Sequence, residues 1–183
     1  MSVTPDLDSR FRVAALGEGL VDVRYDVVDS PVGPLHLAQT ERGLCRISYF
    51  GEDWEEVLAR QFGVRVLRSP LDEVRRELDE YFEGRRRTFD LPIDLRVAPF
   101  HSDVLRELAR VPYGHTDTYG SLARKAGRPG AARAVGTVMN RNPIPIVLPC
   151  HRIVGASGAL TGYAGGLDAK RHLLRLEGAI LPE

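Results

Sequence analysis

The residues best suited to chemistry lie in the segment IPIVLPCHRIVGASGALTGYAGG, residues 144–166. Cys150 follows Pro149 and is followed directly by His151 and Arg152. A cysteine reacts as its thiolate, and nearby basic groups make that form accessible near neutral pH. The segment therefore indicates a reactive thiol. It also fits a buried cysteine in a tight loop, since cysteine and histidine are common neighbours.

A glycine-rich run follows this cysteine. Glycine lets the backbone turn tightly and approach a small ligand closely. The run therefore favours a loop that wraps round a ligand beside the thiol, and its glycines are Gly155, Gly158, Gly162, Gly165 and Gly166.

The second cysteine, Cys45, lies in the alternating segment GLCRISYF and is expected to be a small core residue. The two cysteines form no C-x-x-C pair and no zinc-type spacing, so we expect no metal and no cofactor. The start of the chain lacks the pattern of a secretory signal, and no apolar run approaches a membrane span. These features predict a cytoplasmic protein without a membrane partner.

The zero net charge of the 183 residues hides a division. Residues 1–95 carry 13 Lys and Arg against 19 Asp and Glu, whereas residues 96–183 carry 12 against 6. A basic half can attract a polyanion locally. Ordinary surface variation explains the division equally well.

The first half of the chain predicts an antiparallel meander and helices. Residues 1–22 are polar without a clear period, and we expect a loose, disordered extension there. Turn residues separate three short strand-like runs, and apolar spacing predicts helices after them. The strands are expected at residues 23–30, 31–40 and 43–51, the helices at 54–62 and 71–82, and an extended edge or linker at 89–95.

The second half predicts mostly helix, so the expected fold class is α+β. The expected domains are the extension 1–22, an N-terminal domain 23–95 and a C-terminal domain 96–183. Ser102 is the expected cap of the first helix, and Pro129 suits a first helical turn. A short Gly-Arg-Pro-Gly connection before an alanine-rich helix fits a helix-turn-helix, as it fits two ordinary packed helices. The helices are expected at residues 100–111, 118–127, 129–141 and 166–178.

Several of these segments together resemble one known family. They are VPYGHTDTYGSLARKAGRPGAARAVGTVMNRNPIPIVLPCHR, the glycine-rich run with the last helix, and the weaker DSPVGPLHLA and EYFEG. The resemblance covers roughly residues 23–179. It is to the O6-alkylguanine-DNA alkyltransferases, also called methylated-DNA–protein-cysteine methyltransferases. The resemblance implies repair by an irreversible, single-turnover transfer of the alkyl group to the protein's own cysteine.

The resemblance implies roles for individual residues. Cys150 matches the nucleophile, His151 the base that acts through a water, and Glu177 the carboxylate that orients the histidine. Asn142 matches the asparagine that ties the preceding turn to this network. Tyr119 matches the tyrosine whose hydroxyl reaches the base and donates a proton.

The implied partner is duplex DNA that contains O6-alkylguanine, with O4-alkylthymine a further substrate, bound by a monomer. The family flips the damaged base out of the stack and docks its recognition helix in the minor groove. Arg133 matches the arginine that fills the vacated place, and Ala132 and Ala134 belong to the thin helix face. The residues matching the substrate pocket are Met139, Pro145, Ile153, Tyr163 and Ala164.

Departures from the family pattern are few. Ile153 replaces a commoner valine, Leu105 a frequent tryptophan and His101 a frequent glutamine. Three other functions compete with this one. A damage sensor of this family would lack Cys150. A thiol hydrolase would leave the helix-turn-helix without a role, and a transcription regulator would leave the glycine-rich run unexplained.

Overall fold

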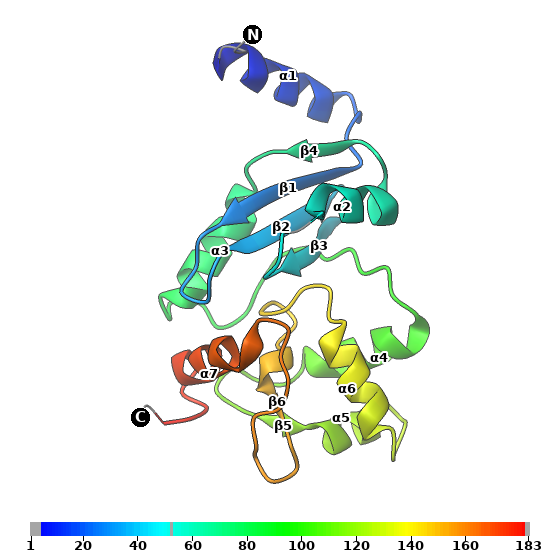
Figure 1. Cartoon of the computed structure of the whole chain (residues 1–183), viewed down its shortest axis with the longest axis vertical. Helices are drawn as coiled ribbons and strands as arrows, with labels where there is room; N and C mark the ends of the chain where they lie inside the picture. The colour runs from blue at the N-terminus through cyan, green and yellow to red at the C-terminus, as the bar shows by residue number, and fades with distance from the viewer. Residues whose placement is uncertain (1–4, 52, 182–183) are drawn as a thin grey trace.

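A four-stranded sheet with its helices stacks on a helical unit in the computed structural model, which describes residues 5–51 and 53–181 (Figure 1). The predicted α+β class is confirmed. No helix within these described ranges combines the length and the apolar character that crossing a bilayer requires.

The sheet has the order β3-β2-β1-β4. β1 pairs antiparallel with β2, and β2 with β3, which confirms the predicted meander. The edge strand β4 pairs parallel with β1 and was not predicted, because its three residues are too few to show a period. The strands are β1 (Val23–Val28), β2 (Leu35–Thr40), β3 (Gly43–Ser48) and β4 (Val66–Arg68).

The two faces of the sheet pack against different helices. A register shift beside Ala38 and Gln39 marks a bulge in the β2–β3 pairing. Cys45 packs there with Trp54 and Leu58 of α2 (Trp54–Phe62), as a small core residue. The opposite face joins the buried side of α3 (Asp72–Phe82) in a second cluster.

The C-terminal unit contains the predicted helices with shifted starts. α4 begins at Pro99, so Ser102 lies inside the helix and is not its cap. Thr118 is the residue that caps α5, accepting a hydrogen bond from the Ser121 amide. Pro129 lies in the turn before α6.

The elements of the C-terminal unit are α4 (Pro99–Leu108), β5 (Asp117–Thr118), α5 (Tyr119–Lys125), α6 (Ala132–Asn140), the 3-10 turn η1 (Cys150–Arg152), β6 (Ile153–Val154) and α7 (Gly166–Leu176).

Backbone hydrogen bonds along the edge strand β3 join the two units. The Leu44 amide donates to the Pro92 carbonyl at 2.8 Å, and the Asp94 amide donates to the Leu44 carbonyl at 3.0 Å. The Ile47 amide donates to the Pro143 carbonyl of the C-terminal unit at 2.8 Å. The larger apolar cluster also continues from one unit into the other. The extended segment near residues 89–95 therefore covers a strand edge that would otherwise be open.

The N-terminal extension differs from its prediction. Residues Pro5–Gly17 form the helix α1, which lies beyond the sheet at the end next to β4 (Figure 1). The Arg12 guanidinium donates to the Arg68 carbonyl at 2.6 Å, and Ala15 is buried. The helix has no pronounced apolar stripe, so the period of the sequence did not reveal it. Residues 1–4 of the predicted loose extension lie outside the described residues.

A substitution at Gly43 tests the close contact between β3 and the segment at Pro92. Its φ is +136°, and a Cβ there would lie 2.2 Å from the Pro92 carbonyl oxygen. We expect Gly43→Ala to lower the free energy of unfolding by about 2 kcal/mol or more, through strain and overpacking. Gly84→Ala is the control, because Gly84 has a φ of +72° and open space around it. Equal losses in the two variants, measured by urea unfolding, would contradict the close approach.

Candidate active site

The turn that presents Cys150 is fixed by Asn142. Its amide nitrogen donates to the Leu148 carbonyl at 2.8 Å, and its amide oxygen accepts from the Ile144 amide at 3.2 Å. Ile146, between them, has a φ of 74°, a strained conformation for a β-branched residue. Such strain persists only where the surroundings determine the backbone, and it is frequent at functional sites. Asn142 therefore ties together the turn that leads into Cys150.

A short parallel strand pair brings the helix-turn-helix next to Cys150. β5 pairs with β6 through Asp117 with Ile153 and Thr118 with Val154. Tyr119 directly follows β5, and η1 directly precedes β6. Because the strands are parallel, the start of α5 lies beside the start of the glycine-rich loop that follows β6, and the cysteine turn lies at the other end of these two-residue strands.

His151 and Glu177 meet although 26 residues separate them. His151 Nε2 lies 2.9 Å from Glu177 Oε1, and both side chains are buried. This contact places the proton of the neutral imidazole on Nε2, facing the carboxylate. Nδ1 is also buried and has no hydrogen-bond partner among the described residues. It is therefore free to accept a proton.

The Glu177 carboxylate accepts hydrogen bonds from donors in three separate parts of the chain. Tyr81 Oη of α3 donates to Oε1 at 2.7 Å, and the Gly114 amide donates to Oε2 at 3.3 Å. Arg152 donates from Nε to Oε2 at 2.8 Å and from Nη2 to Oε1 at 2.9 Å. Burying a carboxylate is costly without such partners. These donors hold Glu177 charged and fixed behind His151.

Burial keeps the thiol and the imidazole neutral. It raises the pKa of Cys150 to about 11, although Asn142 and Lys170 oppose the shift. It also lowers the pKa of His151, against the opposing effect of Glu177. Burial alone would raise the pKa of Glu177, but hydrogen bonds from His151 and Arg152 bring it to about 2. The site thus holds a protonated thiol, a neutral imidazole and a carboxylate, the arrangement that general-base activation requires.

Lys170 is a buried cation close to this group. Its ammonium donates to the Ile153 carbonyl at 2.6 Å and to the Thr161 carbonyl at 3.0 Å. Burial lowers the pKa of Lys170, and a thiolate at Cys150 would oppose that shift. Lys170 thus connects α7 to β6 and to Thr161 within the glycine-rich loop.

A groove of about 530 Å³ lies at the helix-turn-helix, between the start of α5 and the first turns of α6. The Tyr119 ring packs against Gly136, where a Cβ would lie 4.0 Å from it. Tyr119 Oη is 2.9 Å from Thr161 Oγ1 of the glycine-rich loop. Cys150 is only 4% exposed and does not line the groove. The groove is lined by Thr118, Tyr119, Gly120, Arg124, Ala132, Arg133, Gly136 and Ala156.

The groove brings together Tyr119, Ala132 and Arg133 of the predicted DNA-binding set. Ala134 is exposed but does not line it. The predicted pocket residues Met139, Pro145 and Ile153 are buried, Tyr163 is partly buried and Ala164 is exposed.

Sequence reasoning gave no role to four side chains of this site. Arg152 was quoted only as a neighbouring basic group, although it binds the carboxylate. Lys170 could have been found, because helical spacing places it on the same face as Leu173 and Leu174. Tyr49 and Tyr81 reach the site from the N-terminal unit, and no local pattern reports such a contact.

Two protein-family models match this chain. Residues 23–95 match the family model "6-O-methylguanine DNA methyltransferase, ribonuclease-like domain". Residues 99–179 match "6-O-methylguanine DNA methyltransferase, DNA binding domain". Together with the geometry, these matches define a two-domain DNA-binding protein built around one cysteine.

Individual relatives give the same result. The chain is 42% identical to a methylated-DNA–protein-cysteine methyltransferase of Methanosarcina barkeri, over 84% of this chain and 96% of the relative. It is 44% identical to that of Mycolicibacterium paratuberculosis, over 85% and 92%. The crystal structure of the Mycobacterium tuberculosis O6-methylguanine methyltransferase matches with a TM-score of 0.77 and 41% identity, over 87% and 95%. The chain belongs to the methylated-DNA–protein-cysteine methyltransferase family.

The lowered pKa of Glu177 predicts how the free energy of unfolding depends on pH. Its pKa falls from an ordinary 4.5 to about 2 on folding, so its contribution is complete above 4.5 and is lost as the pH falls toward 2. We expect the free energy of unfolding to decrease more steeply across this window in the wild type than in Glu177→Gln. Denaturant unfolding at a series of pH values measures both slopes. Equal slopes would show that the carboxylate is not held as described.

Proposed function

We propose that the protein repairs O6-alkylguanine in DNA by moving the alkyl group to its own Cys150. The observation that supports this best is the buried Cys150 next to a fixed His151–Glu177 pair with a free Nδ1. The adjacent groove at the helix-turn-helix supports DNA as the source of the alkyl group. A related M. tuberculosis protein, 40% identical over 85% of this chain and 93% of its own, has been crystallised in complex with DNA, with a TM-score of 0.75.

In the proposed reaction His151 Nδ1 takes the Cys150 thiol proton through a water molecule. The sulfur attacks the saturated carbon, a carbon–sulfur bond forms, and the bond from that carbon to O6 breaks. The electron pair stays with guanine, and Tyr119 donates a proton to the departing base and recovers one from solvent. Glu177 stabilises the imidazolium that forms. Removal of the proton is necessary because the thiol is protonated at neutral pH.

The product is a thioether, and this predicts one turnover per molecule. An acyl-enzyme has a carbonyl that water can attack, whereas a thioether carbon has none. Cys150 is therefore consumed in the reaction, and no second step restores the thiol.

We propose that the substrate is duplex DNA and that the protein acts on it as a monomer. A base inside a duplex must leave the stack before the nearly enclosed Cys150 can reach it. Arg133 is exposed at the groove and suits the vacated position, while Ala132 and Ala134 let the backbone approach DNA closely. Phosphate contacts from the basic half make binding salt-dependent.

The flipped base is proposed to enter between the cysteine turn and the glycine-rich loop. Met139 and Pro145 supply apolar surface, and backbone groups at Cys150 and Ile153 accept from the amino group of the base. Tyr163 lines the pocket, and the Ala164 amide donates to the base. O4-alkylthymine would enter the same way. The proposed domains are 23–95 and 96–183, whose boundary lies where the two family models meet. A reducing compartment, the cytoplasm, is proposed because the reaction needs a free thiol.

The function is tested with duplex DNA that carries radiolabelled O6-methylguanine. We expect about one label per protein molecule, acid-stable and bound to Cys150, because no step releases it. Cys150→Ala should abolish transfer and retain DNA binding. Cys45→Ser is the control and should still transfer, since Cys45 packs against α2 away from the turn. Full transfer by Cys150→Ala would refute the assignment, and repeated release of label would indicate a hydrolase.

A substitution of Arg133 tests base flipping separately from alkyl transfer. Arg133→Ala should slow repair of duplex DNA on the order of tenfold to a hundredfold, because the flipped state loses its support. Reaction with free O6-benzylguanine should change little, since no stack is opened. The matched control is Arg128→Ala, which removes the same charge from the exposed turn before α6. Single-turnover rates on both substrates give the comparison, and equal slowing on duplex and free base would contradict the role.

A further inference from the structure

We propose that Tyr49, a residue of the N-terminal sheet unit, is a positioning residue that limits the size of the alkyl group the site accepts. It does so by holding Tyr163 and the backbone at Gly165 of the glycine-rich loop. The inference rests on the proposed function, because the size of an alkyl group matters only if Cys150 receives one.

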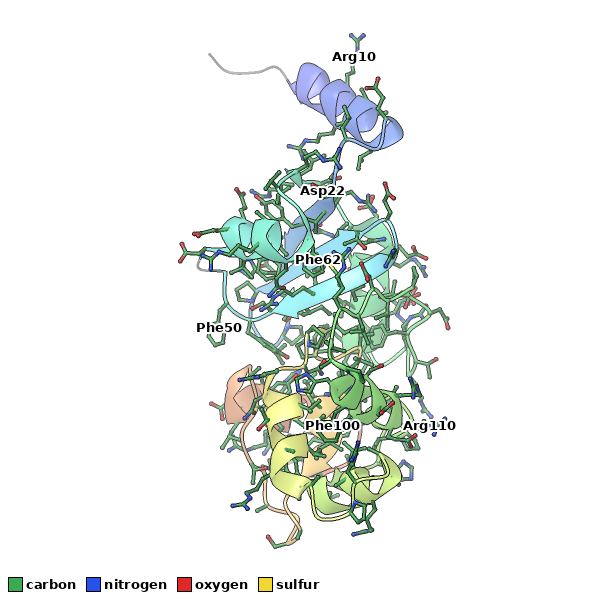
Figure 2. All side chains as sticks on the ribbon, turned by 90° about the vertical axis from the view of Figure 1, so that its right-hand side faces the viewer. Arg10, Asp22, Phe50, Phe62, Phe100 and Arg110 are labelled. Carbon is green, nitrogen blue, oxygen red and sulfur yellow. The ribbon has the colours of Figure 1, made fainter. Side chains whose placement is uncertain are left out.

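Tyr49 directly follows β3 and turns toward the C-terminal unit. Its hydroxyl lies 2.8 Å from the Tyr163 hydroxyl, and the two rings meet edge-on with centroids 5.7 Å apart. The next residue, Phe50, is 68% exposed and points away from the molecule (Figure 2). Adjacent aromatic residues thus have opposite surroundings, and only Tyr49 reaches the site.

The ring of Tyr49 also lies directly on the loop backbone. A Cβ added at Gly165 would lie 2.7 to 2.9 Å from three atoms of this ring. Real Cβ atoms do not approach other atoms so closely, so the contact depends on glycine at this position. Tyr49 therefore holds the loop twice, through its hydroxyl on Tyr163 and through its ring on Gly165.

The line of contacts continues to the reacting group. The Tyr163 ring meets the His151 ring at 87°, with centroids 6.4 Å apart. Burial, and then the Cys150 charge, raise the pKa of Tyr163, while burial raises the pKa of Tyr49 further than the Tyr163 hydrogen bond lowers it. Both hydroxyls stay protonated and pair with each other at any pH at which the protein works. Tyr49 is thus two contacts away from the catalytic histidine.

The loop itself has few other constraints. Between β6 and α7 its backbone closes one small turn, from the Gly155 amide to the Ala159 carbonyl, and a last one from the Gly166 amide to the Tyr163 carbonyl. A further backbone bond runs from the Gly158 amide to the Gly155 carbonyl, and side chains of Tyr119 and Lys170 bind the loop at Thr161. The part from Tyr163 to Gly165 is held by Tyr49 together with the packing of Tyr163 against the larger apolar cluster, and Tyr49 supplies the side-chain hydrogen bond to Tyr163.

A larger alkyl group needs space that Tyr163 and this loop occupy. Tyr49→Phe removes the hydroxyl bond but keeps the ring over Gly165. We expect the ratio of benzyl to methyl transfer rates to rise about threefold to tenfold, the range of one hydrogen bond. A residue that only supported the fold would change both rates together and leave this ratio unchanged.

The experiment measures single-turnover transfer from duplexes that carry O6-methylguanine or O6-benzylguanine, with the full chain. Gly165→Ala is a second variant, because its methyl group displaces the Tyr49 ring without requiring a positive φ. It should raise the same ratio. Gly162→Ala is the matched loop control, since its Cβ meets only Asn140 at an ordinary 3.9 Å. Tyr25→Phe is the hydroxyl control, because Tyr25 bonds Glu55 of α2.

Further results test whether the Tyr49–Tyr163 hydrogen bond limits the size of the alkyl group. Tyr49→Phe combined with Tyr163→Phe should shift the ratio no more than either single change, because both delete the same bond. An unchanged ratio in Tyr49→Phe and Gly165→Ala, with the wild type active, would overturn the role of Tyr49 and leave the proposed function intact. A wild type that transfers neither group would overturn the proposed function, and this inference with it.

Discussion

The site depends on one buried negative charge, the carboxylate of Glu177. It accepts hydrogen bonds from Tyr81, Gly114, His151 and Arg152, which lie in the N-terminal unit, the segment before α5 and the cysteine turn. A buried carboxylate that loses partners is destabilising, so these segments are held in one relative arrangement. Fixing the charge therefore fixes the orientation of His151 and the place of Cys150. Arg152 also donates to the Val111 carbonyl at 2.6 Å, which ties the end of the α4 segment into the same group.

This arrangement resolves a conflict between reactivity and protection. A thiolate at rest would be open to oxidation and to reagents other than the substrate. Burial holds Cys150 protonated with a raised pKa, and the free His151 Nδ1 stands ready to remove the proton. The thiol therefore stays protonated until a base removes its proton. For a protein that uses its cysteine once, such a delay protects the single reaction it can perform.

The sequence marked the segment around Cys150 but not the distant side chains that contact it. Local signals marked the cysteine segment and the alanine-rich helix without deciding their roles, which only the family resemblance implied, and α2 was predicted with the bounds it has. Helix caps were predicted less well, because α4 begins at Pro99 and Ser102 therefore lies inside the helix. The contacts of Tyr81 and Tyr49 join residues 96 and 114 positions apart, and no periodicity or motif encodes a pairing at that distance. The helix α1 was missed for a different reason, since a helix with little apolar character leaves no pattern to detect.

The N-terminal unit acts on the site at two separate points. Tyr81 donates to the carboxylate behind His151, and Tyr49 holds the aromatic ring in front of it. A continuous apolar cluster and the backbone bond from Ile47 to Pro143 keep both tyrosines in register with the C-terminal unit. The charge division along the chain fits the same arrangement, because the acidic unit needs no DNA contact to contribute. The N-terminal unit therefore supplies contacts to the side chains around Cys150, while the C-terminal unit supplies the thiol and the groove.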